Sequence, residues 1–286
     1  MSTVGTPLHT FHDASGKITV TVFTSRGNPE QEVWIDQEIL VGDADMVAIG
    51  GGGAASDGFE NTMSPGGPGS FLTASYPNAN LSGWLVGARD QQSPQNYGLL
   101  SFVIGMKIAG LSRNQLLRHI VSNPSDSGAG NHPEAEASIS SNEYVLVGGG
   151  FHVDNGHANL ATASFPSSAT SWKARSQDHS VPSPANIRAF AIGIHKKLPG
   201  VGTVMSSFSD ATSQSSGPHP FAIATVNPGF ALTGGGAQVQ SSVNGNLLWK
   251  LVPSADQTPT FETASKDHFV SAPATITAYA VGLRIH

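Results

Sequence analysis

The feature of this chain that most constrains its fold is a unit that occurs three times. Each copy has an aromatic residue, an aspartate six residues later and a glycine fifteen residues after that, with no gaps. The three sets are Trp84, Asp90 and Gly105; Trp172, Asp178 and Gly193; and Phe261, Asp267 and Gly282. A run of glycines precedes each set, at 50–52, 148–150 and 234–236. Self-similarity at a nearly fixed period predicts one body with pseudo-threefold symmetry.

The composition favours strands and excludes several classes of protein. The chain of 286 residues has 33 Gly and 18 Pro spread between short apolar runs, which predicts many turns and therefore many strands. A net charge of −6, with only Lys196 and Lys197 adjacent among the basic residues, argues against nucleic-acid binding. The absence of cysteine excludes disulfides, thiol nucleophiles and thiolate metal sites.

Targeting signals are not visible in the sequence. The segment from Met1 to His12 has neither a basic region nor an apolar run, so we expect no classical signal peptide. The longest apolar stretch, 99–111, contains Lys107 and is too short to cross a bilayer. We therefore expect a soluble product that is made in the cytoplasm and that can act outside the cell after another route of release.

Each copy predicts five strands, and the fifth is the most regular. The expected strands are 32–39, 135–139 and 221–226; 47–49, 144–147 and 230–233; 71–77, 160–166 and 247–253; the segments with the aromatic residues; and 99–107, 187–195 and 276–284. In the fifth strand, small residues such as Ala189 and Ala191 alternate with bulky ones such as Phe190 and Ile192. We expect the bulky face to fill a shared core and the small face to let another element approach.

The copies differ in a few places. Copy one has a Gly-Ser-Pro loop around 56–70 that is nine residues longer than its counterpart in copy two, and we interpret it as a specialised lip containing Ser56, Asp57 and Asn61. The segment 112–120 begins with a good N-cap and predicts the one helix. The predicted fold is all-β: a pseudo-threefold β-prism of three similar antiparallel sheets (32–286, with repeats at about 32–122, 132–207 and 219–286), an N-terminal arm (1–31) and one short connecting helix.

The glycine run, the Leu/Thr/Ser strand that ends in Pro, the Trp followed by Asp-His, and the small-aromatic-small pattern ending in Gly resemble a known module. It is the three-repeat β-prism, or β-tripod, at the C-terminus of some bacterial perforin-like (MACPF) proteins, insecticidal ones included. The resemblance covers roughly 32–285. It implies a threefold prism that recognises a cell-surface glycan or receptor. It does not imply pore formation, because the helical clusters that become membrane hairpins are absent from this sequence.

The Asp-His pairs are the first candidate site. A carboxylate beside an imidazole can bind a sugar hydroxyl or help to hold a cation, which makes Asp90, Asp178, His179, Asp267 and His268 candidate ligand-binding residues. The alternative is a turn in which Asp caps backbone N–H groups, and Gln91 in copy one breaks a strict Asp-His requirement. Trp84 and Trp172 are candidate sugar-stacking platforms, although Phe261 at the same position suits a buried core equally well.

Other kinds of binding site have weaker support in the sequence. The glycine runs are not followed by Gly-Lys-Ser/Thr and so predict close packing near the threefold axis instead of a phosphate loop. His152, Asp154 and His157 lie in one hairpin of one copy, which favours a turn over a metal site. Calcium at the loop carboxylates is conceivable, but they are not clustered, and we expect no cofactor.

Hydrolase motifs are missing, and although two carboxylates could still meet in space for glycoside hydrolysis, we expect no enzyme because threefold repetition distributes equivalent residues. The predicted function is non-enzymatic recognition of a cell-surface glycan or receptor, associated with a toxin. The first alternative is a membrane-damaging, pore-forming or insecticidal protein whose N-terminal arm and helix change conformation. The second is an assembly protein whose repeats pack against partners.

Overall fold

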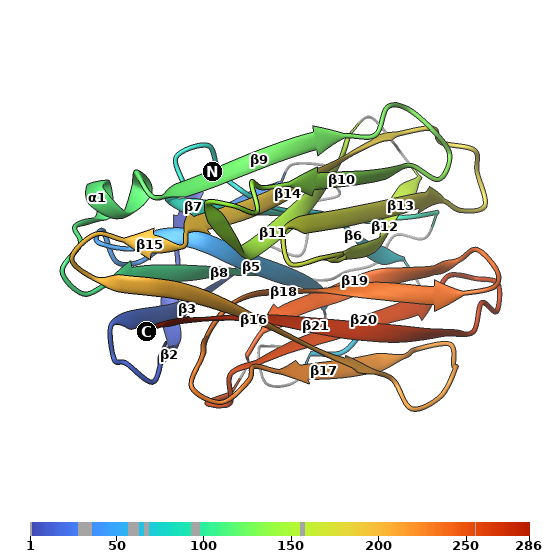
Figure 1. Cartoon of the computed structure of the whole chain (residues 1–286). Coiled ribbons are helices and arrows are strands. Elements are labelled where there is room, and N and C mark those ends of the chain that lie inside the picture. The colour runs from blue at the N-terminus through green and yellow to red at the C-terminus, as the bar shows by residue number, and fades with distance from the viewer. Residues whose placement is uncertain are drawn as a thin grey trace.

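The computed structural model describes residues 2–27, 36–56, 63–65, 69–92, 98–154, 158–254 and 256–286. These residues form three seven-stranded sheets and one short helix. Figure 1 shows how these elements are arranged. The predicted all-β class with three similar sheets is therefore confirmed. Every strand pair is antiparallel except that of β1 and β4.

The first sheet has the order β1 (Ser2–Val4), β4 (Gln37–Leu40), β7 (Gly83–Asp90), β6 (Ser70–Pro77), β11 (Tyr144–Asp154), β14 (Asn186–His195) and β9 (Ile120–Asp126). The second has the order β10 (Glu134–Ser138), β13 (Ser171–Asp178), β12 (Asn159–Pro166), β18 (Ala231–Ser241), β21 (Ala274–Ile285), β16 (Gly202–Thr212) and β15 (Lys197–Leu198). The third has the order β17 (Phe221–Thr225), β20 (Thr260–Asp267), β19 (Asn246–Pro253), β5 (Val47–Ser56), β8 (Gly98–Ile108), β3 (Ile18–Arg26) and β2 (Thr6–His12).

Each sheet is shared by two copies. Three strands of one copy join three strands of the next, and the third sheet joins copy three back to copy one, which closes the cycle. The copies meet at three equivalent short pairings, β6 with β11, β12 with β18 and β19 with β5, each of two residue pairs. No copy can therefore complete a sheet by itself, and the three copies fold as one body.

The predicted N-terminal arm contains strands of this body. β3 pairs with β8 along its whole length, from Ile18 opposite Ile108 to Arg26 opposite Leu100. β9 pairs in the same way with β14, and β16 with β21, so β3 is the first strand of copy one. Ile18 and Val20 are fully buried, which gives the strand its packing energy.

The predicted helix is present but shorter than the sequence indicates. α1 (Arg113–Leu117) starts at a capping box in which Ser112 Oγ accepts from the Gln115 N–H and the Gln115 side chain accepts from the Ser112 N–H. The chain leaves the helix before Ile120, which begins β9. Sheet pairing therefore ends the helix earlier than its apolar periodicity predicts.

The glycine runs pack where the three copies meet. A Cβ atom on Gly50 would lie 2.3 Å from Thr233 O, and one on Gly148 would lie 2.3 Å from Ile49 O. The first glycine of each run thus faces the backbone of a neighbouring copy, with Gly234 against Gly148. The next glycine in each run faces the aromatic residue of its own copy. The predicted close packing is confirmed.

The two faces of the fifth strands alternate as expected, but the bulky face fills the shared core only in part. Ile104, Ile192 and Val281 are fully buried in the main core, and the alanines of the small face are buried as well. Phe190 and Tyr279 are only half-buried, and each stacks on an aromatic ring of the adjoining copy.

Candidate apical recognition site

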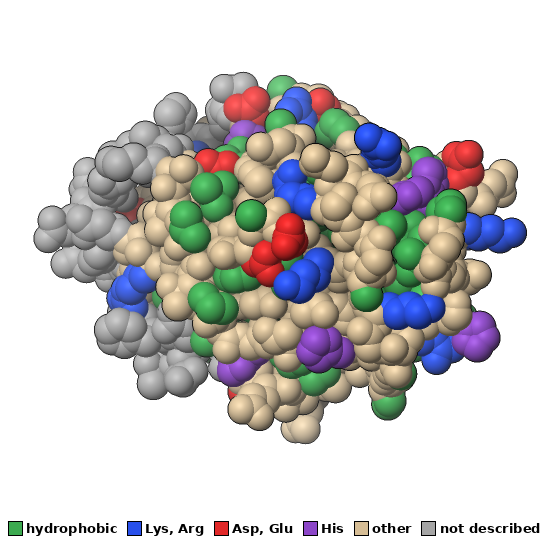
Figure 2. All heavy atoms as spheres, turned by 90° about the vertical axis from the view of Figure 1, so that its left-hand side faces the viewer, with side chains coloured by type: hydrophobic (Ala, Val, Ile, Leu, Met, Phe, Trp, Pro, Cys, Tyr) green, Lys and Arg blue, Asp and Glu red, His purple; other side chains and the backbone are tan. Residues whose placement is uncertain are grey.

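The strands with the three aspartates end together at one end of the prism, which we name the apical end. It lies opposite the end with α1 and the C-terminus, which is on the left in Figure 1. Figure 2 looks at that other end, where Lys and Arg side chains are dispersed among polar side chains. One of the ion pairs there joins Lys107 to Asp43 at 2.9 Å. At the apical end, several loops expose large apolar side chains.

A ring of three hydrogen bonds lies across the axis at the apical end, and we name it the axial ring. His179 Nε2 lies 2.9 Å from His268 O, His268 Nε2 lies 2.8 Å from Gln91 O, and Gln91 Nε2 donates to His179 O at 3.3 Å. Because a carbonyl oxygen only accepts, Nε2 carries the proton in both histidines. Each copy thus donates one side-chain N–H to the backbone of another copy.

The ring explains why Gln91 replaces histidine in copy one. The position requires a side-chain N–H that reaches one carbonyl oxygen, and Gln Nε2 meets that requirement as His Nε2 does. Gln91, His179 and His268 are 4%, 9% and 0% exposed. The two histidines predicted to bind a ligand therefore link the copies instead of facing solvent.

The surroundings of His268 favour its neutral form. Burial lowers the pKa of His268 below its ordinary value, and the positive charge of nearby Lys266 and the neighbouring His179 act in the same direction. The hydrogen bond to Gln91 O opposes this effect without reversing it. Among the described residues, Nδ1 of His268 has no hydrogen-bond partner, so a second proton there would be buried without an acceptor.

An apolar plug lies beneath the ring. Phe71, Leu160 and Leu247 occupy equivalent positions, are fully buried and form a small cluster of their own. The edge of the Phe71 ring meets His268 with a centroid separation of 5.3 Å. The plug and the axial ring together fill the axis beneath the loops that surround it.

The three aspartates lie beside the ring but take part in different contacts. Ser70 Oγ donates to Asp90 at 2.7 Å. Asp178 lies 3.3 Å from His132 Nε2 and also accepts from the Ser183 N–H, whereas Asp267 lies 3.4 Å from His219 Nε2. Both histidines are more than half exposed. Asp178 thus combines the predicted turn-capping role with a surface His-Asp pair, and Asp267 forms the equivalent pair in copy three.

Two buried asparagines fix the loops that follow these aspartates. Asn159 Nδ2 donates to Asn131 O and to Ser183 O, and Asn246 Nδ2 donates to Pro218 O and to Ala272 O. Sequence reasoning missed these residues. Their signal is the spacing, because each lies seven residues before the proline that ends the third strand.

The residue after each ring member has a left-handed backbone. Gln92, Ser180 and Phe269 have φ angles of 57°, 66° and 55°. Polar residues tolerate this conformation moderately well, but it is unusual for a bulky aromatic residue. Phe269 is nevertheless 59% exposed, and its neighbour Val270 is 62% exposed. Val181 and Val243 add further exposed apolar surface from loops beside the ring.

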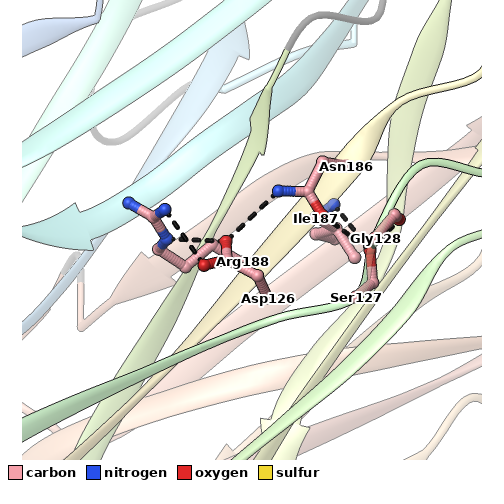
Figure 3. Close-up of polar contacts among 6 residues, drawn as sticks. All are labelled: Asp126, Ser127, Gly128, Asn186, Ile187 and Arg188. Atoms are coloured by element: carbon pink, nitrogen blue, oxygen red, sulfur yellow. Dashed lines mark hydrogen bonds and ion pairs between the residues drawn. The ribbon is translucent and has the colours of Figure 1, made fainter.

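The flank of the apical end near β9 is polar and well ordered. Arg188 donates to both carboxylate oxygens of Asp126, and Asn186 donates to the same carboxylate (Figure 3). The hydrogen bonds from Arg188 lower the pKa of Asp126. Ser127 Oγ accepts from the Ile187 N–H and so joins the two strand ends. Among the described residues of the apical end, the exposed large apolar side chains are Val181 in copy two and Val243, Phe269 and Val270 in copy three.

The remaining predicted ligand residues that the structure describes are buried. Trp84 and Trp172 are fully buried, each with Nε1 donating to a serine hydroxyl at 2.9 Å, so the stacking-platform prediction is wrong and the core alternative holds. Ser56 is also fully buried and accepts from the Ser64 N–H. Asp57 and Asn61 lie outside the described residues.

No group of three potential His, Cys, Asp or Glu ligands occurs among the described residues. His152 lies 3.4 Å from Asp36, while His157 lies outside the described part of the chain. Among the described residues, no helix has the length and apolar character needed to cross a membrane.

Comparisons with known proteins add little. No protein-family model and no curated protein matches the chain. A chain from the atomic structure of Sulfolobus Turreted Icosahedral Virus is 8% identical and has a TM-score of 0.18, with 93% of this chain and 86% of that chain covered. A chain from a study of the triple jelly roll fold and turret assembly in an archaeal virus is 7% identical, also with a TM-score of 0.18, covering 93% and 85%. Such low scores carry no argument.

Proposed function

We propose that this protein is a non-enzymatic recognition module that binds a cell-surface glycan or receptor through its apical end. The observation that carries the proposal is Phe269, a bulky, exposed side chain on a left-handed backbone. Unfavourable backbone conformations persist where the surrounding structure enforces them, and they are concentrated at functional sites. The axial ring and the plug provide that support here.

The chemistry of the apical end suits a ligand with both apolar and hydroxyl-bearing surfaces. Phe269 and Val270 offer an apolar contact, while the His132–Asp178 and His219–Asp267 pairs offer exposed donors and acceptors nearby. A sugar ring combines such surfaces. The resemblance to the β-tripod modules of perforin-like proteins supports the same class of function and a toxin-associated role, which also remain proposals.

A glycan array with the purified protein tests the proposal directly, with and without EDTA. We expect binding to a subset of glycans or to target-cell membranes, and we expect EDTA to have no effect because no metal cluster is present among the described residues. Phe269→Ala removes the exposed ring, and Val4→Ala is the matched control, because Val4 is a similarly exposed apolar residue on an edge strand in sheet one.

Binding that survives in Phe269→Ala, or that is lost equally in Val4→Ala, would place recognition elsewhere. A dye-leakage assay with target-cell vesicles separates recognition from membrane damage, since a pure recognition module leaves vesicles intact. The full-length pairing of β3 with β8 disfavours the membrane-damaging alternative, because the N-terminal arm would have to leave a formed sheet.

A further inference from the structure

The six outermost strands of the three sheets differ in how they are protected. Unpaired backbone groups of an edge strand can pair with another chain, and proteins limit this with short strands, proline or charge. Five of the six edges have such a feature: β1 has three residues, β15 has two, β9 contains Pro124, β2 contains Pro7, and β10 exposes Glu134 and Glu136. β17, with the sequence Phe-Ala-Ile-Ala-Thr, has none.

Comparison of the copies shows that the exception is specific to β17. The residues opposite the fourth-strand aromatics align Ile39, Ala137 and Ala224. The positions one and three residues before them are acidic in the first two copies: Glu38 and Glu136 at the first position, and Asp36 and Glu134 at the second. Copy three has Phe221 and Ile223 at these two positions, and they are 46% and 41% exposed. The charge that would prevent strand pairing is therefore replaced by apolar surface.

The backbone of β17 is open on the side away from β20. The even-numbered residues face β20, because Pro220 O accepts from the Ser265 N–H and the Val226 N–H donates to Pro259 O. Antiparallel pairing alternates these directions, so Phe221 and Ile223 present their N–H and C=O groups outward. Thr225 O is already used, since Ser209 Oγ donates to it. The open stretch is therefore Phe221 to Ile223.

A groove lies beside this open stretch. It has a volume of about 600 Å³ and is lined by residues 211–215 and 217–223. The molecule itself shows that this type of edge accepts another strand: β4, the counterpart of β17 in copy one, pairs with β1 along Ser2–Val4. β17 has the same position in its sheet and no such strand among the described residues.

We propose that β17 is a dimerisation edge and that its partner is β17 of a second copy of this chain. An antiparallel pair centred on Ala222 sets Phe221 opposite Ile223 of the partner subunit, a favourable aromatic and β-branched cross-strand pair. This arrangement uses only the open backbone groups and obeys a twofold axis, so both strands make the same contacts. Because the other described edges are protected, assembly stops at the dimer. The dimer is independent of apical recognition, but it doubles the number of apical sites.

Sedimentation velocity across a wide range of protein concentrations tests this proposal. We expect a concentration-dependent dimer for the natural sequence and a monomer for Phe221→Glu/Ile223→Glu, which gives copy three the acidic pattern of copy two. Facing glutamates and the loss of the apolar pair should weaken the dimer roughly a hundredfold or more. Phe269→Glu, at the apical end, is the matched control and should remain dimeric.

A thermal melt of the double variant checks that it is folded. Amide hydrogen exchange at Phe221 and Ile223 gives a second readout, since both amides should exchange more slowly at concentrations that favour the dimer. A natural protein that stays monomeric at every concentration overturns the proposal. So does a dimer that persists in the double variant or disappears in Phe269→Glu.

Discussion

The axis and the periphery of this prism follow opposite rules. Along the axis the three copies use equivalent residues for equivalent contacts, as in the glycine layer, the plug of Phe71, Leu160 and Leu247, and the axial ring. At the periphery equivalent positions differ in chemistry, as with Glu136 and Ile223, or Ser180 and Phe269. Residues near the axis contact their own counterparts, so one change there disturbs two other copies. Peripheral residues do not contact their counterparts, so one copy can change there and gain a function without disturbing the other two.

The strongest test of this contrast is a methyl group at the axis. Gly150→Ala would place Cβ 2.2 Å from Ser75 O and 3.0 Å from Tyr76 Cα, both backbone atoms of another copy. Because backbone atoms cannot move aside cheaply, we expect a loss of about 3 kcal/mol or more in the free energy of unfolding. Chemical denaturation measures it. Gly130→Ala is the control, because a Cβ there has no neighbour within 4 Å. Equal stability of the two variants would show that the axis is loosely packed.

The axial ring gives a smaller and more selective effect. His268→Ala leaves Gln91 O without its donor in a buried site and removes packing against Phe71, which should cost about 2–4 kcal/mol. His268→Gln should retain most of that stability, because copy one already uses glutamine at this position. Chemical denaturation of His268→Ala and His268→Gln measures how much free energy of unfolding each variant loses. If both lose the same amount, the ring contributes packing alone and the shared donor role is wrong.

The sequence predicted much of the axis, because repetition exposes what all three copies share. The fifth-strand faces, the glycine packing and the helix start followed from periodicity and turn chemistry. The axial ring could not be predicted, because its acceptors are backbone carbonyls of other copies and sequence similarity does not show backbone acceptors. Gln91 was therefore interpreted as an exception, although it is a member of the ring.

Nothing in the sequence indicates that each sheet is shared by two copies. The joining pairs, such as Phe151 with Ser75, involve only two residues each and have no pattern of their own. β3 falls in the predicted N-terminal arm because the recognisable repeats begin after it. Periodicity identifies strands well, but it does not identify which strands are neighbours.

Stability should also depend on pH through the ring. The pKa of His268 is lowered in the folded protein because burial disfavours its charged form. Below the ordinary histidine pKa of about 6.5, the unfolded chain therefore binds more protons than the folded one, and stability falls as the pH decreases. Thermal melts between pH 7 and pH 5 should show a falling Tm. His119 also has a lowered pKa, so the His268→Gln variant isolates the ring contribution by its shallower fall. Parallel curves for the two proteins would assign the pH dependence elsewhere.

The smallest expected change in stability is at the periphery, and its sign separates a functional residue from a structural one. Phe269→Asn places a residue that tolerates the left-handed region at φ 55°, and the side chain it replaces is mostly exposed. We therefore expect the free energy of unfolding to stay unchanged or to rise by up to about 1 kcal/mol. Glycan or cell-surface binding should fall at the same time, because the exposed ring is lost.

A residue kept for stability would show the reverse. The Phe269 and His268 ring centroids are 4.2 Å apart, and if this contact supports the axis, Phe269→Asn will unfold more easily than the natural protein. Denaturation and binding measured on the same preparation distinguish the two outcomes. A stable variant with weakened binding shows that the unfavourable backbone of copy three serves to present an aromatic side chain. An unstable variant shows instead that Phe269 stabilises the axis, and it removes the main support for apical recognition.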